Sequence, residues 1–174
     1  MLSVSSGPDD SVRIVPLNNE AEYVVPLYSD MIYRIALTHT CSREDAEDVL
    51  QEVFLTYYRK NKEFNEEEHR KSWLIRVTLN CCDRTLAKRK KQQYVPIDAL
   101  EIPVRFEYDS DKTVYRAVLS LPEKLRRVVE LFYFEELSAK EIGKVLNLRE
   151  SAVFMRLSRA RAELKEKLKG EFEL

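Results

Sequence analysis

The stretch SAKEIGKVLNLRESAVFMRLSRARAELKEKL, residues 138–168, has the pattern of two helices joined by a short turn. Ser138 and Glu141 are spaced as a capping box, which predicts that the first helix begins after Ser138. Asn147 tolerates the left-handed conformation that ends a helix, so the turn falls there. With apolar residues placed between the two helices, the pattern predicts a helix-turn-helix. The residues expected to be buried are Ala139, Ile142, Leu146, Leu148, Val153 and Leu157.

The second helix of this motif has two apolar residues, Phe154 and Met155, in its first turns. At about 100° per residue, the face that contains Val153 and Leu157 is the buried one. Met155 then points away from the core, whereas Phe154 lies on the flank, where both packing and DNA contact stay open. The spacing alone also fits a hairpin from an ordinary helical bundle. Basic residues toward the end of the helix favour DNA binding.

The rest of the chain predicts an all-α protein with two small helical domains joined by a flexible linker. Apolar residues recur at helical spacing over residues 20–92 and predict a three-helix bundle, in which Ser42 and Asp45 form a second capping box. Residues 93–112 contain two prolines and no sustained period, which is typical of a linker. We expect residues 113–170 to form the helix-turn-helix domain and residues 1–19 a loose arm.

Composition excludes several classes of protein. No apolar run approaches the roughly 20 residues that cross a bilayer, and the N-terminus lacks the basic start of a signal peptide, so we expect a cytoplasmic protein without membrane insertion. His39 and His69 have no nucleophile at motif spacing, and no phosphate loop or metal-ligand cluster is present in the sequence. We therefore expect no catalytic residues, no metal, no cofactor and no small-molecule substrate. Of the adjacent Cys81 and Cys82, one is expected in the core and one at its edge.

Charge is unevenly distributed in a chain whose net charge is only −1. Acidic residues concentrate between Glu44 and Glu68, whereas basic residues concentrate after Arg84 and in the last helix. One acidic and two basic surfaces predict more than one partner.

Three segments in order resemble the small bacterial RNA polymerase sigma factors of the extracytoplasmic-function (ECF) group, in the sigma-70 family. They are EDAEDVLQEVF (residues 44–54), SWLIRVTLN (residues 72–80) and the helix-turn-helix with the segment LPEKLRRVVELFYFEE before it. The resemblance covers roughly residues 21–168. It implies that residues 20–92 are sigma region 2, which binds core RNA polymerase and the promoter −10 element, and that residues 113–170 are region 4, which binds the −35 element.

The resemblance also assigns residues to three surfaces. The acidic stripe on the second helix is implied to bind core polymerase, and includes Asp45, Asp48, Gln51 and Glu52. The third helix and its basic end are implied to bind −10 DNA through Trp73, Arg76, Asn80, Lys88, Arg89, Lys90 and Lys91, although the Trp73 ring itself is expected to pack. The last helix is implied to bind −35 DNA through Ser151, Phe154, Met155, Ser158, Arg159, Arg161 and Lys165.

These expectations make the chain a dissociable initiation factor, not an enzyme, whose partners are core RNA polymerase, promoter DNA and an anti-sigma factor. Against the family's usual polar residues, Phe154 and Met155 predict apolar contact with thymine methyl groups. Two other classes remain as alternatives: a helix-turn-helix regulator without sigma activity, and a helical adaptor that binds only protein. The acidic stripe favours the sigma reading, because a regulator of that kind has no use for it.

Overall fold

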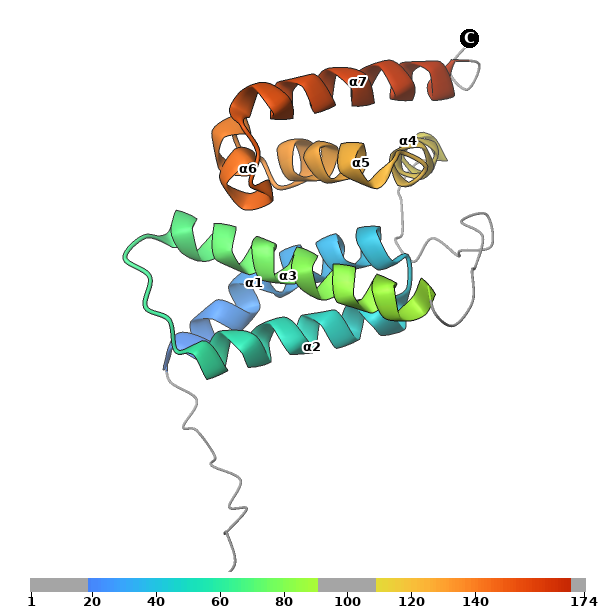
Figure 1. Cartoon of the computed structure of the whole chain (residues 1–174). Helices are drawn as coiled ribbons and strands as arrows, with labels where there is room; N and C mark the ends of the chain where they lie inside the picture. The colour runs from blue at the N-terminus through green and yellow to red at the C-terminus, as the bar shows by residue number, and fades with distance from the viewer. Residues whose placement is uncertain (1–18, 91–108, 170–174) are drawn as a thin grey trace, which may run out of the picture.

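The computed structural model describes residues 19–90 and 109–169, and all of the regular elements in these two ranges are helices. Figure 1 shows two layers: a bundle of α1, α2 and α3 lies below, and the C-terminal helices lie on top of it. The expected arm and most of the expected linker fall outside the described residues. The all-α fold with two helical units is confirmed.

The lower layer is a three-helix bundle of α1 (Asn19–Thr40), α2 (Arg43–Lys60) and α3 (Glu67–Lys90). Its core takes apolar residues from each helix at spacings of three and four. Burying a side chain such as Ile32 or Leu74, both inaccessible to solvent, contributes about 1.5–3 kcal/mol each. The buried α2 residues are Ala46, Val49, Val53, Phe54 and Tyr57.

The Ser42–Asp45 capping box is only half formed. The Ser42 side chain accepts from the Asp45 N–H at 3.3 Å, as expected. The Asp45 carboxylate, expected to return a bond to Ser42, instead pairs with Arg89 of α3 at 3.1 Å, and the Ser42 N–H donates to Thr40 Oγ1. A cation from α3 is thus the partner of this carboxylate, and local spacing contains no information about it.

The upper layer contains α4 (Asp109–Leu119), α5 (Glu123–Val129), the π-helical turn η2 (Glu130–Phe134), α6 (Ala139–Leu146) and α7 (Glu150–Leu168). The Ser138–Glu141 capping box is complete, and Asn147 ends α6 with φ 54° and ψ 52°. Gly143 makes the tight turn feasible, because a Cβ there would lie 2.7 Å from the Leu148 carbonyl oxygen. The helix-turn-helix is confirmed, with Ile142, Val153 and Leu157 fully buried.

The two layers share one apolar core. A single cluster of buried residues includes Leu74, Ile75 and Leu79 of α3 together with Val128, Leu131 and Ile142 of the upper layer. This packing corrects the expectation for the cysteines: Cys81 and Cys82 are both fully buried. Glu130 and Arg127 of the upper layer are among the charged groups that act on the Cys82 thiol, so the second layer covers what would otherwise be the edge of the bundle.

Candidate polymerase and promoter surfaces

The predicted polymerase-binding stripe lies along α2, on the side of the bundle away from the upper layer (Figure 1). Asp48, Gln51 and Glu52 are exposed, and Asp45 is partly buried. Two of the three carboxylates are paired with α3: Asp45 with Arg89, and Glu52 with Arg84 at 2.7 Å. Asp48 and Gln51 therefore form the more open part of the stripe.

Trp73 belongs to an aromatic cluster at the start of α3. Its ring lies 6.0 Å from that of Tyr57 and 5.7 Å from that of Phe64, centroid to centroid. Phe64 is in the loop between α2 and α3, and Lys62 and Arg70 each place a cation over its ring, at 5.3 and 5.8 Å from the centroid. Trp73 is half-buried, so its ring packs as expected and anchors the loop.

The groove beside this loop has a volume of about 330 Å³ and contains both cationic and aromatic side chains. Region 2 contributes Phe64, Trp73 and Arg76 to its lining, and α6 contributes Glu141 and Lys144. Hydrogen bonds from the Ser138 hydroxyl and backbone N–H hold the pKa of Glu141 below its usual range, so this carboxylate remains ionised. The groove thus lies between the two layers.

The other predicted −10 residues are spread along α3. Arg76 and Asn80 are exposed and line a second groove, and the Arg76 guanidinium donates to the Lys144 carbonyl at 2.7 Å. Lys88 and Lys90 are exposed, whereas Arg89 is half-buried and also donates to the Thr40 carbonyl at 2.7 Å. Lys91 lies outside the described residues. The structure therefore gives Arg89 a bracing position between α1, α2 and α3.

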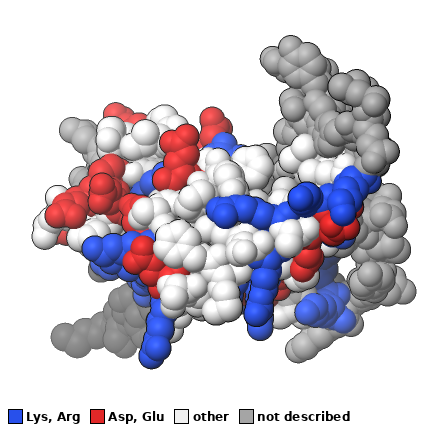
Figure 2. All heavy atoms as spheres, turned by 90° about the horizontal axis from the view of Figure 1, so that it is seen from above, with Lys and Arg blue, Asp and Glu red and all other residues white. Residues whose placement is uncertain are grey.

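All seven predicted −35 residues project from the outer face of α7. Ser151, Ser158, Arg159 and Lys165 are exposed, and Phe154 and Met155 retain 53% and 55% of their accessible surface, so neither packs into the core. The seventh, Arg161, donates from Nε to the Tyr133 hydroxyl at 2.9 Å. Figure 2, which looks down on this layer, shows lysine and arginine side chains in a row across the surface. The basic residues of α7 are Arg156, Arg159, Arg161, Lys165 and Lys167.

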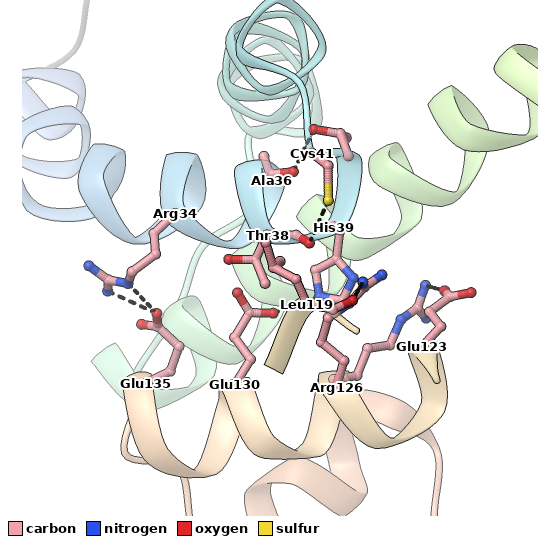
Figure 3. A network of polar contacts seen from close by, with 12 residues as sticks. Arg34, Ala36, Thr38, His39, Cys41, Leu119, Glu123, Arg126, Glu130 and Glu135 are labelled. Atoms are coloured by element: carbon pink, nitrogen blue, oxygen red, sulfur yellow. Dashed lines mark hydrogen bonds and ion pairs between the residues drawn. The ribbon is translucent and has the colours of Figure 1, made fainter. Parts of the chain in front are cut away.

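A polar network between the two layers could not be seen in the sequence (Figure 3). His39 Nε2 lies 2.6 Å from Glu130 Oε2, and both side chains are almost fully buried. Arg34 Nη2 lies 2.8 Å from Glu135 Oε1, yet burial outweighs this cation and raises the pKa of Glu135 above its ordinary value. The partners are 91 and 101 residues apart in the chain, a separation that no local pattern reports.

The fold and these surfaces match known proteins. A profile of sigma-70 region 2 matches residues 25–92, and one of sigma-70, region 4 matches residues 111–164. The ECF RNA polymerase sigma factor SigW of Bacillus subtilis (strain 168) is 27% identical over 163 residues, covering 84% of this chain and 87% of SigW. The ECF sigma factor SigM of the same organism is 27% identical over 150 residues, covering 82% and 91%.

Two solved structures have a similar fold. The sigma factor RpoE in complex with the anti-sigma factor NepR from Bartonella quintana superposes with a TM-score of 0.74 at 18% identity, over 87% of this chain and 98% of RpoE. CnrH in complex with the cytosolic domain of CnrY gives 0.65 at 22% identity, over 87% and 90%. None of the described helices combines the length and apolar content needed to cross a membrane. With both sigma regions present in order, the chain belongs to the extracytoplasmic-function group of the sigma-70 family, whose members direct RNA polymerase to promoters in transcription initiation.

Proposed function

We propose that this sigma factor binds core polymerase and the two promoter elements through three separate surfaces. The observation that carries the proposal is α7: on a helix-turn-helix with a closed core, the whole predicted −35 set is exposed and flanked by basic residues. A helix in this position of the motif enters the major groove with its N-terminal residues. Bond-making chemistry belongs to the core enzyme, and the site of action is the cytoplasm, where that enzyme works.

The −35 surface combines phosphate binding with apolar base contact. Arg161 and Lys165, later in α7, are placed for backbone phosphates, which set affinity and register. Phe154 and Met155 are exposed near the N-terminus, where base edges are read. Their side chains offer no hydrogen bond but fit the C5-methyl group of thymine. Arg159, whose guanidinium lies 3.9 Å from the Met155 sulfur, adds a donor beside them.

The −10 surface is proposed to read an unpaired strand. Single-stranded DNA binds grooves that combine cations with aromatic rings. The groove beside Phe64 and Trp73 has this chemistry, and Arg76 and Asn80 extend it along α3. Lys88 and Lys90, exposed at the end of the helix, suit upstream phosphates.

Core polymerase is proposed to bind the α2 stripe, chiefly at Asp48 and Gln51. An anti-sigma factor is proposed as the regulatory partner, because one solved neighbour, RpoE, is bound to the anti-sigma factor NepR. The near-neutral net charge fits a factor that relies on the core enzyme for much of its DNA affinity.

Co-purification with core polymerase followed by run-off transcription tests the proposal. The wild-type chain should bind core and start transcripts at defined promoters, and Asp48→Lys should weaken core binding while −35 duplex binding by the free protein persists. Glu136→Lys, a reversal of an exposed carboxylate in the loop before α6, is the matched control and should bind core normally. DNA binding without core association would instead support a regulator that lacks sigma activity.

A further inference from the structure

Two carboxylates of the acidic stripe on α2 are paired with arginines of α3, and the two pairs differ in exposure. Arg89 and Asp45 lie 3.1 Å apart, and their side chains retain 31% and 24% of their accessible surface. Arg89 also donates to the Thr40 carbonyl, so it braces the bundle. Arg84 and Glu52 lie 2.7 Å apart and retain 59% and 49%. Because an exposed ion pair contributes little to stability, Arg84 and Glu52 can exchange partners without disturbing the fold.

Arg84 lies in line with residues of the proposed −10 surface. Arg76, Asn80, Arg84 and Lys88 follow one another at intervals of four residues, which makes them neighbours along one side of α3. All four side chains are exposed, and Arg84 fills the gap between Asn80 and Lys88. The planar guanidinium group of arginine binds phosphate through two parallel hydrogen bonds. Arg84 therefore has the position and the chemistry of a phosphate contact.

In the free protein the Arg84 side chain is directed toward α2. The same guanidinium nitrogen, Nη2, lies 2.7 Å from the Glu52 carboxylate and 3.1 Å from the Cys81 sulfur. Within the part of the chain that the structure describes, Glu52 is the only carboxylate paired with Arg84. A DNA phosphate that approached Arg84 would meet a carboxylate of its own sign. The ion pair thus lowers the affinity of this arginine for DNA.

Glu52 also belongs to the surface proposed for core polymerase. It follows Gln51 in the chain, and Asp48 lies one turn earlier on the same side of α2. A partner that binds an acidic stripe presents basic groups to it. A basic group placed at Asp48 is within one helical turn of Glu52. It would compete with Arg84 for the Glu52 carboxylate.

We propose that Arg84 is a further phosphate-binding residue for promoter DNA, and that core polymerase frees it by binding its carboxylate partner, Glu52. The exchange moves side chains and leaves the helices in place. It rests on the proposed polymerase and −10 surfaces, and it links them reciprocally. Core polymerase that frees Arg84 for DNA is itself bound more tightly once DNA holds Arg84.

The free protein tests whether Glu52 restrains Arg84. The probe is a short fluorescent duplex that contains the −10 element and its upstream flank but no −35 element, taken from a promoter mapped by run-off transcription. Glu52→Gln should bind this duplex about threefold more tightly than the wild type, and the dependence of affinity on salt should steepen by about one. Adding Arg84→Gln should cancel both changes, whereas Arg84→Gln alone should have little effect.

The matched control for net charge is Glu47→Gln. Glu47 is an exposed carboxylate on the same helix and has no ion pair among the described residues. Its replacement removes one negative charge without freeing a cation, so the salt slope of duplex binding should stay at the wild-type value.

The holoenzyme tests the release of Arg84. Arg84→Gln should now lower the salt slope of promoter binding by about one, and Arg84→Lys, which keeps the charge, should not. Glu52→Gln, assembled with enough core polymerase to saturate binding, should have the wild-type slope, because Arg84 is already free in the wild-type holoenzyme.

Different outcomes overturn different steps. An unchanged salt slope in the Arg84→Gln holoenzyme would overturn the phosphate contact. An equal loss of slope in free protein and holoenzyme would overturn the release, since Arg84 would then bind DNA without core polymerase. Equal duplex binding by free Glu52→Gln and the wild type would overturn the restraint by Glu52. Normal core binding by Asp48→Lys would refute the polymerase surface and the release with it, while the free-protein comparison would still measure the pair of Glu52 with Arg84.

Discussion

The two helices proposed to read promoter DNA differ in how many of their faces are buried. α7 buries one face through Val153, Leu157 and Ala160 and leaves the opposite face open. α3 buries Leu74, Thr78 and Cys81, and also Leu79 and Cys82 on an adjacent face. The second face of α3 is buried because region 4 lies on it. One of the two proposed reading helices thus has an open face, whereas the second face of the other is covered by region 4.

The largest effect on this comparison is expected from Gly143→Ala, which destabilises the helix-turn-helix that contains α7. The new Cβ would meet the Leu148 carbonyl oxygen at 2.7 Å, and this atom is backbone and cannot rotate away. We expect the free energy of unfolding of region 4 to fall by about 2 kcal/mol, and −35 duplex binding to fall with it. Denaturant unfolding and duplex titration measure both.

Lys140→Ala is the matched control for Gly143→Ala, since it also introduces alanine into α6 but at an exposed position. Its free energy of unfolding should change by no more than about 0.5 kcal/mol. Unchanged stability in Gly143→Ala would show that the turn can widen without loss of the motif.

The next effect is expected at the contact between the two layers, where region 4 covers α3. His39→Ala or Glu130→Ala tests it. Either change leaves the other member of a buried pair without its partner, which is destabilising. The loss cannot exceed the free energy of docking between the layers, because separation returns the remaining group to water. Because Cys82 is fully buried beside Glu130 and Arg127 of the upper layer, we expect faster labelling of its thiol by iodoacetamide with region 2 still folded.

A double-mutant cycle separates this pair from general damage. The variant that carries both His39→Ala and Glu130→Ala should be no more open than either single variant, because no unpaired partner remains. Additive increases in Cys82 labelling would mean that the two side chains act independently and do not form a stabilising pair.

The contrast between the two helices also explains what the sequence could predict. On α7, one periodic face and one open face follow from spacing, so the exposure of Met155 and the burial of Val153 were both predicted. The helix-turn-helix caps at Ser138 and Asn147 are local signals as well. Phe154 lay on the flank, where periodicity could not decide, and the structure leaves it exposed.

On α3 the same reasoning failed where a distant segment intervened. Periodicity predicted an edge position for one of the two adjacent cysteines, but the second layer buries both. Likewise, nothing near His39 in the sequence indicates Glu130 as its partner, because pairing across 91 residues is a tertiary property. The Asp45 carboxylate was assigned to a local cap and instead meets Arg89.

A smaller effect is expected from the apolar reading residues, and it separates base contact from packing. Met155→Ser should leave stability intact, because the side chain is more than half exposed. Replacing thymine with uracil in the −35 duplex should weaken wild-type binding by about fourfold at a contacted position, the equivalent of one buried methyl group. The Met155→Ser variant should no longer distinguish the two bases, whereas Met155→Leu should still do so. A loss of stability in Met155→Ser would instead place this residue in the core.

The smallest effect is expected from Tyr133→Phe, which tests whether Tyr133 positions Arg161 of α7 for DNA binding. The hydroxyl of Tyr133 accepts from Arg161 Nε and leaves the other guanidinium nitrogens free to reach a phosphate. Because the contact is exposed, we expect only about a twofold to threefold loss of −35 affinity. The dependence of affinity on salt should not change, since the number of phosphate contacts is the same. Arg161→Ala, by contrast, should lower that salt slope by about one. If Tyr133→Phe lowers the slope as well, the hydroxyl is needed to make the phosphate contact, and α7 is positioned for DNA by a neighbouring side chain of its own layer.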